Sequence, residues 1–174
     1  RPGRPSGLDH FGIEVEDIEL AYDRMRKKYP NCRWVKRPAA RPYAGTSAHD
    51  PDGNVFDLSH RSFKNRGDVY VQEEEKHDRY INRFAVRTLH PEQCAEFFCD
   101  VFELQPANEK GIEGARYVTD GRVTLALMPW DIEDYLDTGI SRIGPEHLGF
   151  KVENIEAFKT GVQNLGERSF LMRT

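Results

Sequence analysis

One phrase occurs twice in this chain and decides its fold. Residues 7–19 read GLDHFGIEVEDIE, and residues 144–156 read GPEHLGFKVENIE. Each copy places a histidine, His10 or His147, at the start of a short stretch in which apolar and polar residues alternate. Alternation is typical of a strand with one buried face, and the Asp or Asn that follows is a common helix N-cap. The repeat therefore predicts two structural units that each begin with a strand and a helix.

The residues after the first copy complete the pattern of its unit. Three further strands are predicted there, at 32–35, 44–49 and 54–59. The last two are separated by Asp50-Pro51-Asp52-Gly53-Asn54, whose residue types strongly favour a turn. The predicted order of this unit is one strand, one helix and then three strands.

A second strand and helix follow a charged stretch. Residues 83–87 are predicted to form the strand, Pro91 begins the helix, and 115–119 and 123–128 form a hairpin. After the second copy of the phrase the sequence contains one more helix, capped by Asn154, but none of the three strands expected by analogy. We therefore expect the chain to be part of a longer protein.

Composition narrows the class of protein. A length of 174 residues allows one or two small domains. The net charge of -4 and the pI near 5.9 argue against a nucleic-acid-binding face, which needs clustered Lys and Arg. No apolar run approaches the roughly 18 residues that cross a bilayer. The three cysteines lack CxxC spacing, which fits a reducing compartment. We expect a cytoplasmic protein without nucleic-acid or membrane partners.

These motifs resemble the vicinal oxygen chelate superfamily, which includes glyoxalase I, bleomycin resistance proteins and extradiol dioxygenases. The matching stretches are His10–Val15, Asp50–Leu58, Pro91–Phe98 and His147–Val152. The resemblance implies an α+β fold of repeated βαβββ modules that form glyoxalase-like open barrels around a divalent metal. It also implies a division of the chain, in which residues 1–66 are the second module of a first domain and 67–79 are a linker. Residues 80–174 are a second domain, with its first module at 80–130 and an incomplete second module at 144–174.

The resemblance implies a metal site in the first unit. His10 matches a first-strand ligand, and Asp57 matches a last-strand carboxylate where the family more often has Glu. The third ligand is expected from a first module outside this sequence. On composition alone, a strand-start histidine bonded to a neighbour is the more ordinary interpretation of His10. Fe(II) is the favoured metal, with Mn, Zn or Ni as alternatives, and the expected substrate is a small molecule with vicinal oxygens.

The second unit departs from the family pattern. His147 matches a ligand position, but the carboxylate of its module would lie beyond the last residue. Arg83 stands where a first-module histidine is expected, and we interpret it as a group that holds a substrate carboxylate, or else as a salt-bridged surface arginine. Two further candidates are His49, a catalytic acid or base beside the turn, and Tyr43, a substrate contact whose alternative role is packing.

Three classes of function stay open. The leading hypothesis is a metal-dependent enzyme, extradiol-dioxygenase-like in preference to glyoxalase-like. The second is a non-catalytic, bleomycin-resistance-like binding protein, which the arginine at 83 and the Asp in place of Glu at 57 both favour. The third is a degenerate structural domain kept for assembly. A homodimer is expected in each case.

Overall fold

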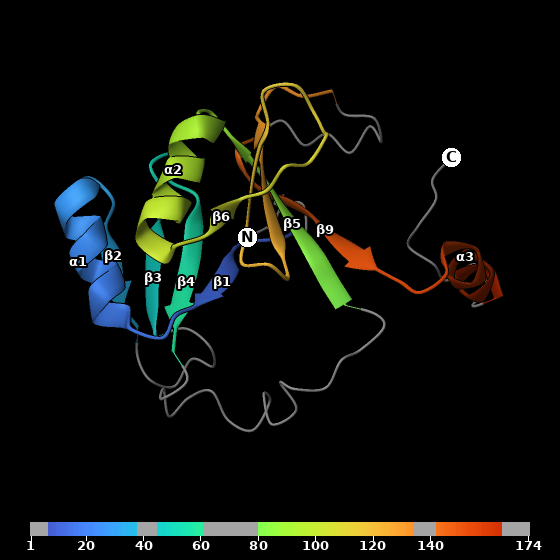
Figure 1. Cartoon of the computed structure of the whole chain (residues 1–174), viewed down its shortest axis with the longest axis horizontal. Coiled ribbons are helices and arrows are strands. Elements are labelled where there is room, and N and C mark those ends of the chain that lie inside the picture. Colours follow the sequence, from blue (N-terminus) through green and yellow to red (C-terminus); the bar gives the residue numbers. More distant parts are fainter. Residues whose placement is uncertain (1–6, 38–44, 61–79, 134–141, 165–174) are drawn as a thin grey trace, which may run out of the picture.

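The computed structural model describes residues 7–37, 45–60, 80–133 and 142–164. They form an α+β fold with two mixed sheets that do not close into a barrel (Figure 1). Among the described residues, no helix is both long enough and apolar enough to cross a membrane. The first sheet begins with a strand and a helix, as the first copy of the repeated phrase predicts. The second copy forms the last strand of the second sheet and the helix that follows it.

The first sheet contains four strands in the order β1-β4-β3-β2. Strands β1 and β4 run parallel, and β4 pairs antiparallel with β3. This is the predicted order of one strand, one helix and three strands. The elements are β1 (Phe11–Glu14), α1 (Ile18–Lys28), β2 (Trp34–Lys36), β3 (Thr46–His49) and β4 (Val55–Ser59).

The second sheet contains five strands in the order β6-β7-β8-β5-β9. Strand β5 pairs parallel with β8 and antiparallel with β9, which carries the second copy of the phrase. The two-residue strand β6 was not predicted, and β5 is longer than the predicted 83–87. The elements are β5 (Tyr80–Thr88), α2 (Pro91–Phe102), β6 (Gln105–Pro106), β7 (Arg116–Thr119), β8 (Thr124–Pro129), β9 (Gly144–Lys151) and α3 (Ile155–Asn164).

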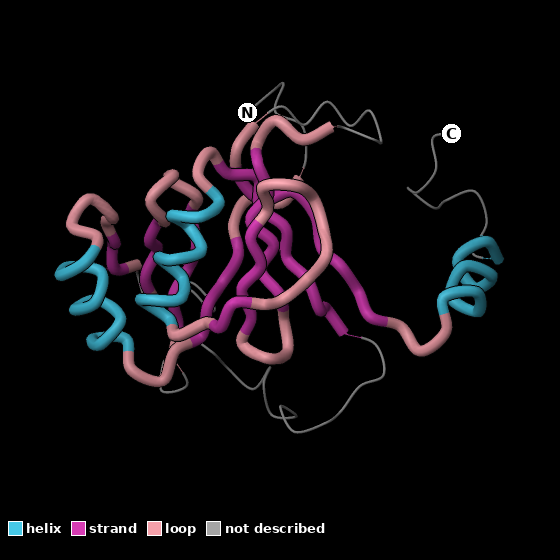
Figure 2. The backbone as a smooth tube through the Cα atoms, turned by 45° about the horizontal axis from the view of Figure 1, so that its top comes forward, coloured by secondary structure: helices cyan, strands magenta, loops and turns pink. Residues whose placement is uncertain are grey.

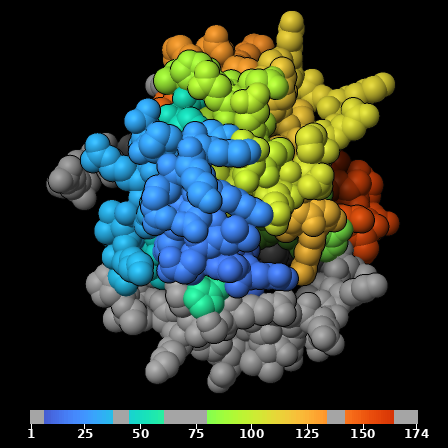
Figure 3. Space-filling view, turned by 60° about the vertical axis from the view of Figure 1, so that its left-hand side comes forward, coloured from blue at the N-terminus to red at the C-terminus, as the bar shows by residue number. Residues whose placement is uncertain are grey.

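Helices α1 and α2 lie side by side and cover one face of each sheet (Figures 1 and 3). Asp17 begins α1, because its Oδ1 accepts hydrogen bonds of 3.0 Å from the backbone N–H groups of Glu19 and Leu20. A single hydrophobic cluster includes residues of both helices and both sheets. Phe56 of β4 is fully buried in this cluster, with the rings of Phe97, Phe98 and Phe102 of α2 within 6.0 Å. The two units therefore share one core.

The turn between β3 and β4 joins the units a second time. Asp50 is fully buried, and its carboxylate accepts hydrogen bonds from the backbone N–H groups of Asp52 and Asn54. Asp52 reaches the end of β5 and the start of α2, where it accepts from the Thr88 hydroxyl and, at 2.7 Å, from the backbone N–H of His90. A stretch predicted only as a turn therefore also anchors the N-terminus of α2.

Helix α3 projects away from both sheets (Figure 2). Asn154 begins it as predicted, since its Oδ1 accepts from the backbone N–H of Ala157 at 2.9 Å. Its apolar residues Ile155 and Phe158 are exposed, and so is Phe150 of β9. No described residue covers this apolar stripe, unlike the stripes of α1 and α2.

Candidate functional site

His10 and Asp57 lie together on the face of the first sheet that α1 does not cover. His10 precedes β1, and Asp57 lies opposite Gly12 in the parallel pairing of β1 with β4. The His10 Nε2 atom is 3.1 Å from Asp57 Oδ2. The histidine side chain is 39% exposed and the aspartate side chain 9%, so the pair has one partly open side. The structure thus brings together the two residues that the resemblance assigned to one metal site.

Asp57 is held by a serine on the neighbouring strand. Ser47 of β3 lies directly opposite Asp57, and its hydroxyl donates to Asp57 Oδ1. Arg37 Nε donates in turn to the Ser47 hydroxyl oxygen at 2.9 Å. Neither residue was singled out in the sequence. The two-residue period of a strand could have identified Ser47, because it lies two residues from the candidate His49 and shares its face of β3.

Both copies of the repeated phrase place an acidic side chain against Nδ1 of their histidine. Asp9 Oδ2 is 3.0 Å from His10 Nδ1, and Glu146 Oε2 is 2.8 Å from His147 Nδ1. An acidic residue directly before each histidine therefore occupies Nδ1 and leaves Nε2 for another partner. A carboxylate on the second ring nitrogen is the usual arrangement of metal-binding histidines, where it orients the ring and raises its basicity.

His49, the predicted acid or base, has both ring nitrogens engaged by backbone groups. Its Nδ1–H donates to the carbonyl of Asp50 at 2.8 Å, and its Nε2 accepts from the N–H of Arg33 at 3.0 Å. A proton transfer at either nitrogen would break one of these bonds. The arrangement favours a structural role that ties β3 to β2, and a catalytic role stays a prediction.

Arg83 lies on the open face of the second sheet within a cluster of its own. It forms an ion pair with Glu109, and its guanidinium lies 5.9 Å from the ring centroid of Tyr117. Glu109 also accepts from the Thr124 hydroxyl at 3.0 Å. A substrate carboxylate would have to displace Glu109 from Arg83. The structure therefore favours the salt-bridged alternative, and substrate binding by Arg83 stays a prediction.

His147 belongs to a different arrangement from that of His10. Glu146 accepts from Arg87 Nε at 2.5 Å through Oε1 and contacts His147 through Oε2. Arg87 is buried at 3% exposure, so Glu146 provides its counter-charge. Among the described residues, no group of three His, Cys, Asp or Glu side chains is arranged to hold a metal, at His147 or elsewhere. Tyr43 lies outside the described residues.

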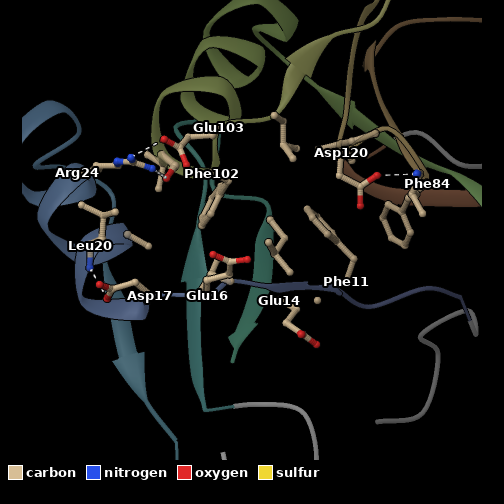
Figure 4. Close-up of a pocket in the computed structure, with 18 of the residues that line it drawn as sticks. Phe11, Glu14, Glu16, Asp17, Leu20, Arg24, Phe84, Phe102, Glu103 and Asp120 are labelled. Atoms are coloured by element: carbon tan, nitrogen blue, oxygen red, sulfur yellow. Dashed lines mark hydrogen bonds and ion pairs between the residues drawn. The ribbon is translucent and has the colours of Figure 1, made fainter. Parts of the chain in front are cut away.

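One cleft of the described structure is lined in part by Phe11 and Gly12 of β1. Its volume is about 900 Å³, and it runs along the edge of β1 toward the C-terminal end of α2 (Figure 4). Phe11, Phe84 and Phe102 line it, together with the charged side chains of Glu14, Glu16, Asp17, Arg24, Glu103 and Asp120. Neither His10 nor Asp57 is among the lining residues, so we base the candidate site on the side chains able to do chemistry and not on this cleft.

Comparisons with known proteins support the fold. No model of a protein family matches the chain, and neither does any curated protein sequence. A solved structure described as a xylose isomerase-like TIM barrel/4-hydroxyphenylpyruvate dioxygenase fusion protein is similar over 93% of this chain, with a TM-score of 0.52 and 14% identity. This chain covers 30% of that protein. Another, described as a possible glyoxalase from Bacillus cereus, is similar over 71% of this chain and 99% of its own length, with 17% identity and a TM-score of 0.34.

The fusion protein carries the structural argument, since its similarity extends over nearly the whole chain. Together with the two-sheet topology and the repeated strand–helix phrase, it confirms the expected fold class. The chain has an α+β fold similar to that of the fusion protein, and at 14% identity the comparison shows the fold alone.

Proposed function

We propose that His10 and Asp57 are two ligands of a divalent-metal site, and that the protein is a metal-dependent enzyme acting on a small molecule with vicinal oxygens. The observation that carries the proposal is the distance of 3.1 Å between His10 Nε2 and Asp57 Oδ2. A histidine nitrogen and a carboxylate oxygen at this distance from each other could both reach one divalent ion. The pair therefore fits a metal without rearrangement of the strands.

The surroundings of the pair also fit a metal. With Nδ1–H of His10 donating to Asp9, the Nε2 lone pair on the side of Asp57 would be available to a metal. A nitrogen and a carboxylate oxygen suit Fe(II), Mn, Zn and Ni, and two histidines with one carboxylate form the usual set for Fe(II) oxygenases. When bound, such a metal supplies a Lewis acid with open positions for two neighbouring substrate oxygens. His10 and Asp57 would hold it.

The pairing of strands in the second sheet supports a route by which a third ligand would reach this site. Strand β9, which carries the second copy of the phrase, pairs antiparallel with β5, and His147 lies opposite Ala85. A Cβ atom at Gly149 would lie only 2.9 Å from Cβ of Arg83 on β5, so this glycine is needed for the pairing. The equivalent Gly12 has no such neighbour, and β1 is an edge strand of the described sheet. We infer that a strand of the β5 type pairs with β1 and supplies the third ligand.

Metal analysis of the full-length natural protein tests this proposal. The protein is purified without added metal, analysed for bound elements, and then titrated with Fe(II), Mn(II), Zn(II) and Ni(II). We expect near-stoichiometric metal, and a loss of affinity of roughly 100-fold or more in His10→Ala and in Asp57→Asn, because each removes a ligand. The metal that is bound separates oxygen chemistry from isomerisation.

The matched control is His90→Gln. His90 also bonds an aspartate, through Nδ1 to Asp52 Oδ1 at 2.7 Å, but at the start of α2. This variant should bind metal like the wild type. Unchanged metal content in His10→Ala would refute the site.

A non-catalytic small-molecule binding protein is the second candidate. It is favoured by the observation that no group of three potential ligands is arranged to hold a metal among the described residues. If the full-length protein binds none of the four metals, the proposal of a metal-dependent enzyme is overturned and the binding protein is the better account.

A further inference from the structure

The carboxylate of Asp57 is fixed from the side opposite to His10. Resting on the metal site proposed above, we propose that Ser47 and Arg37 are positioning residues, which present Asp57 to the metal through a single oxygen atom, Oδ2. Neither residue touches the metal position itself. Their contribution is to determine which oxygen of the carboxylate is free and where it lies.

The chemistry of the three groups determines the direction of every hydrogen bond. Arg37 can only donate, and it donates from Nε to the Ser47 hydroxyl oxygen at 2.9 Å. The Asp57 carboxylate can only accept, so the single proton of the Ser47 hydroxyl is directed to Asp57 Oδ1. Ser47 is 8% exposed and Asp57 6%, so water does not readily replace this bond. The order is therefore Arg37 to Ser47 to Asp57.

This order divides the carboxylate into two unlike oxygens. Oδ1 is engaged by Ser47, and Oδ2 faces His10 Nε2 at 3.1 Å. A metal at this position would meet Oδ2 alone, which predicts monodentate coordination. Without Ser47, the carboxylate is free to rotate about its last bond and to offer both oxygens. Loss of a group that orients a ligand typically weakens metal binding by about 10- to 100-fold.

The test measures Co(II) binding to the full-length protein and the visible spectrum of bound Co(II), which reports coordination number. We expect Ser47→Ala to weaken binding about 10- to 100-fold and to change the spectrum. Ser47→Thr keeps the hydroxyl and should restore both. The matched control is Thr46→Val on the same strand, because the Thr46 hydroxyl bonds Tyr22 on the opposite face of the sheet. Wild-type affinity and spectrum in Ser47→Ala would overturn the proposal.

Replacement of Arg37 distinguishes a role in positioning Ser47 from a simple effect of its positive charge. If it acted only as a positive charge, Arg37→Met would strengthen Co(II) binding, because a cation repels the metal. If it orients Ser47, the variant should weaken binding in the wild-type background and have no effect in the Ser47→Ala background. Stronger binding, or the same effect in both backgrounds, would contradict a positioning role for Arg37.

A metal-free measurement distinguishes failure of this inference from failure of the proposed function. The side-chain ¹⁵N resonances of His10, recorded without metal at one fixed pH, report its contact with Asp57. We expect them to shift in Ser47→Ala and not in Thr46→Val. Such a shift in a protein that binds no metal would support the positioning of Asp57 and overturn the metal site. If the protein binds metal but Ser47→Ala changes neither the resonances nor the affinity, the metal site is supported and the positioning role is overturned.

Discussion

Phe56 connects the two units, and its replacement tests whether they share one core. It belongs to β4 of the first sheet and is fully buried. The ring centroids of Phe97, Phe98 and Phe102, all on α2, lie 5.6–6.0 Å from that of Phe56. A residue of the first unit thus packs against the helix of the second unit, so its truncation should lower the stability of both units.

The expected cost of Phe56→Ala follows from its burial. Truncation of a fully buried phenylalanine costs about 3–5 kcal/mol, from lost transfer free energy and the cavity that remains. The edge-to-face contact with the Phe102 ring, at an interplanar angle of 89°, adds to this free-energy cost beyond the buried area. A total stability of about 5–15 kcal/mol makes this a large fraction. Val55→Thr on the same strand is the control, since Val55 is exposed and should change stability by less than about 0.5 kcal/mol.

The two tryptophans allow each unit to be followed separately. Trp34 lies in the first sheet, stacked on Tyr22 at 5.1 Å, and Trp130 follows β8 in the second. Urea unfolding of the full chain is monitored by fluorescence in two backgrounds, Trp130→Phe and Trp34→Phe. We expect Phe56→Ala to lower the free energy of unfolding by about 3–5 kcal/mol with either reporter.

A difference between the two reporters would refute the reasoning. If the Trp34 signal lost about 3 kcal/mol while the Trp130 signal kept its midpoint, the units would unfold independently and Phe56 would stabilise only its own sheet. The Val55→Thr control excludes a general effect of changing β4.

Two further predictions concern the turn and the thiols. Burial raises the pKa of Asp52, but the hydrogen bonds from His90 and Thr88 outweigh it, so the net pKa is below the usual value. Ionised Asp52 therefore stabilises the fold above pH about 4, and Asp52→Ala should lose about 1.5–3 kcal/mol at pH 7 and less as the pH falls through the native pKa, measured by urea unfolding; an unchanged difference between pH 7 and pH 3 would contradict this. Burial raises the pKa of the Cys32 thiol to about 11 and also raises that of Cys94, so both should resist a thiol reagent at pH 8 until urea unfolds the chain, and rapid labelling of the native protein would disprove it.

The helices and strands follow from local sequence. The alternation after His10 and His147 and the caps Asp17 and Asn154 predicted their strands and helices, because period and capping depend on residues a few positions apart. The bound metal, the substrate and the roles of His49 and Arg83 stay predictions.

The residue types in the repeated phrase also determined part of the site. An acid directly before each histidine is visible in the printed sequence, and the parallel pairing of the first and last strands of a unit places His10 beside Asp57. The family resemblance, and not spacing, connected these two residues, which are 47 positions apart in number. The structure then brought their side chains to 3.1 Å.

Only the tertiary structure decided the rest. Pairing of β3 with β4 places Ser47 behind Asp57, and the turn between these strands places Asp52 at the start of α2. Arg83 and Glu109 meet because the chain returns over the second sheet. Such contacts join residues that are distant in sequence, so they depend on strand register and on how the units pack. Strand register and the packing of the units are not encoded by any local sequence pattern. The period of a strand and the cap of a helix depend on neighbouring residues and are therefore visible in the sequence.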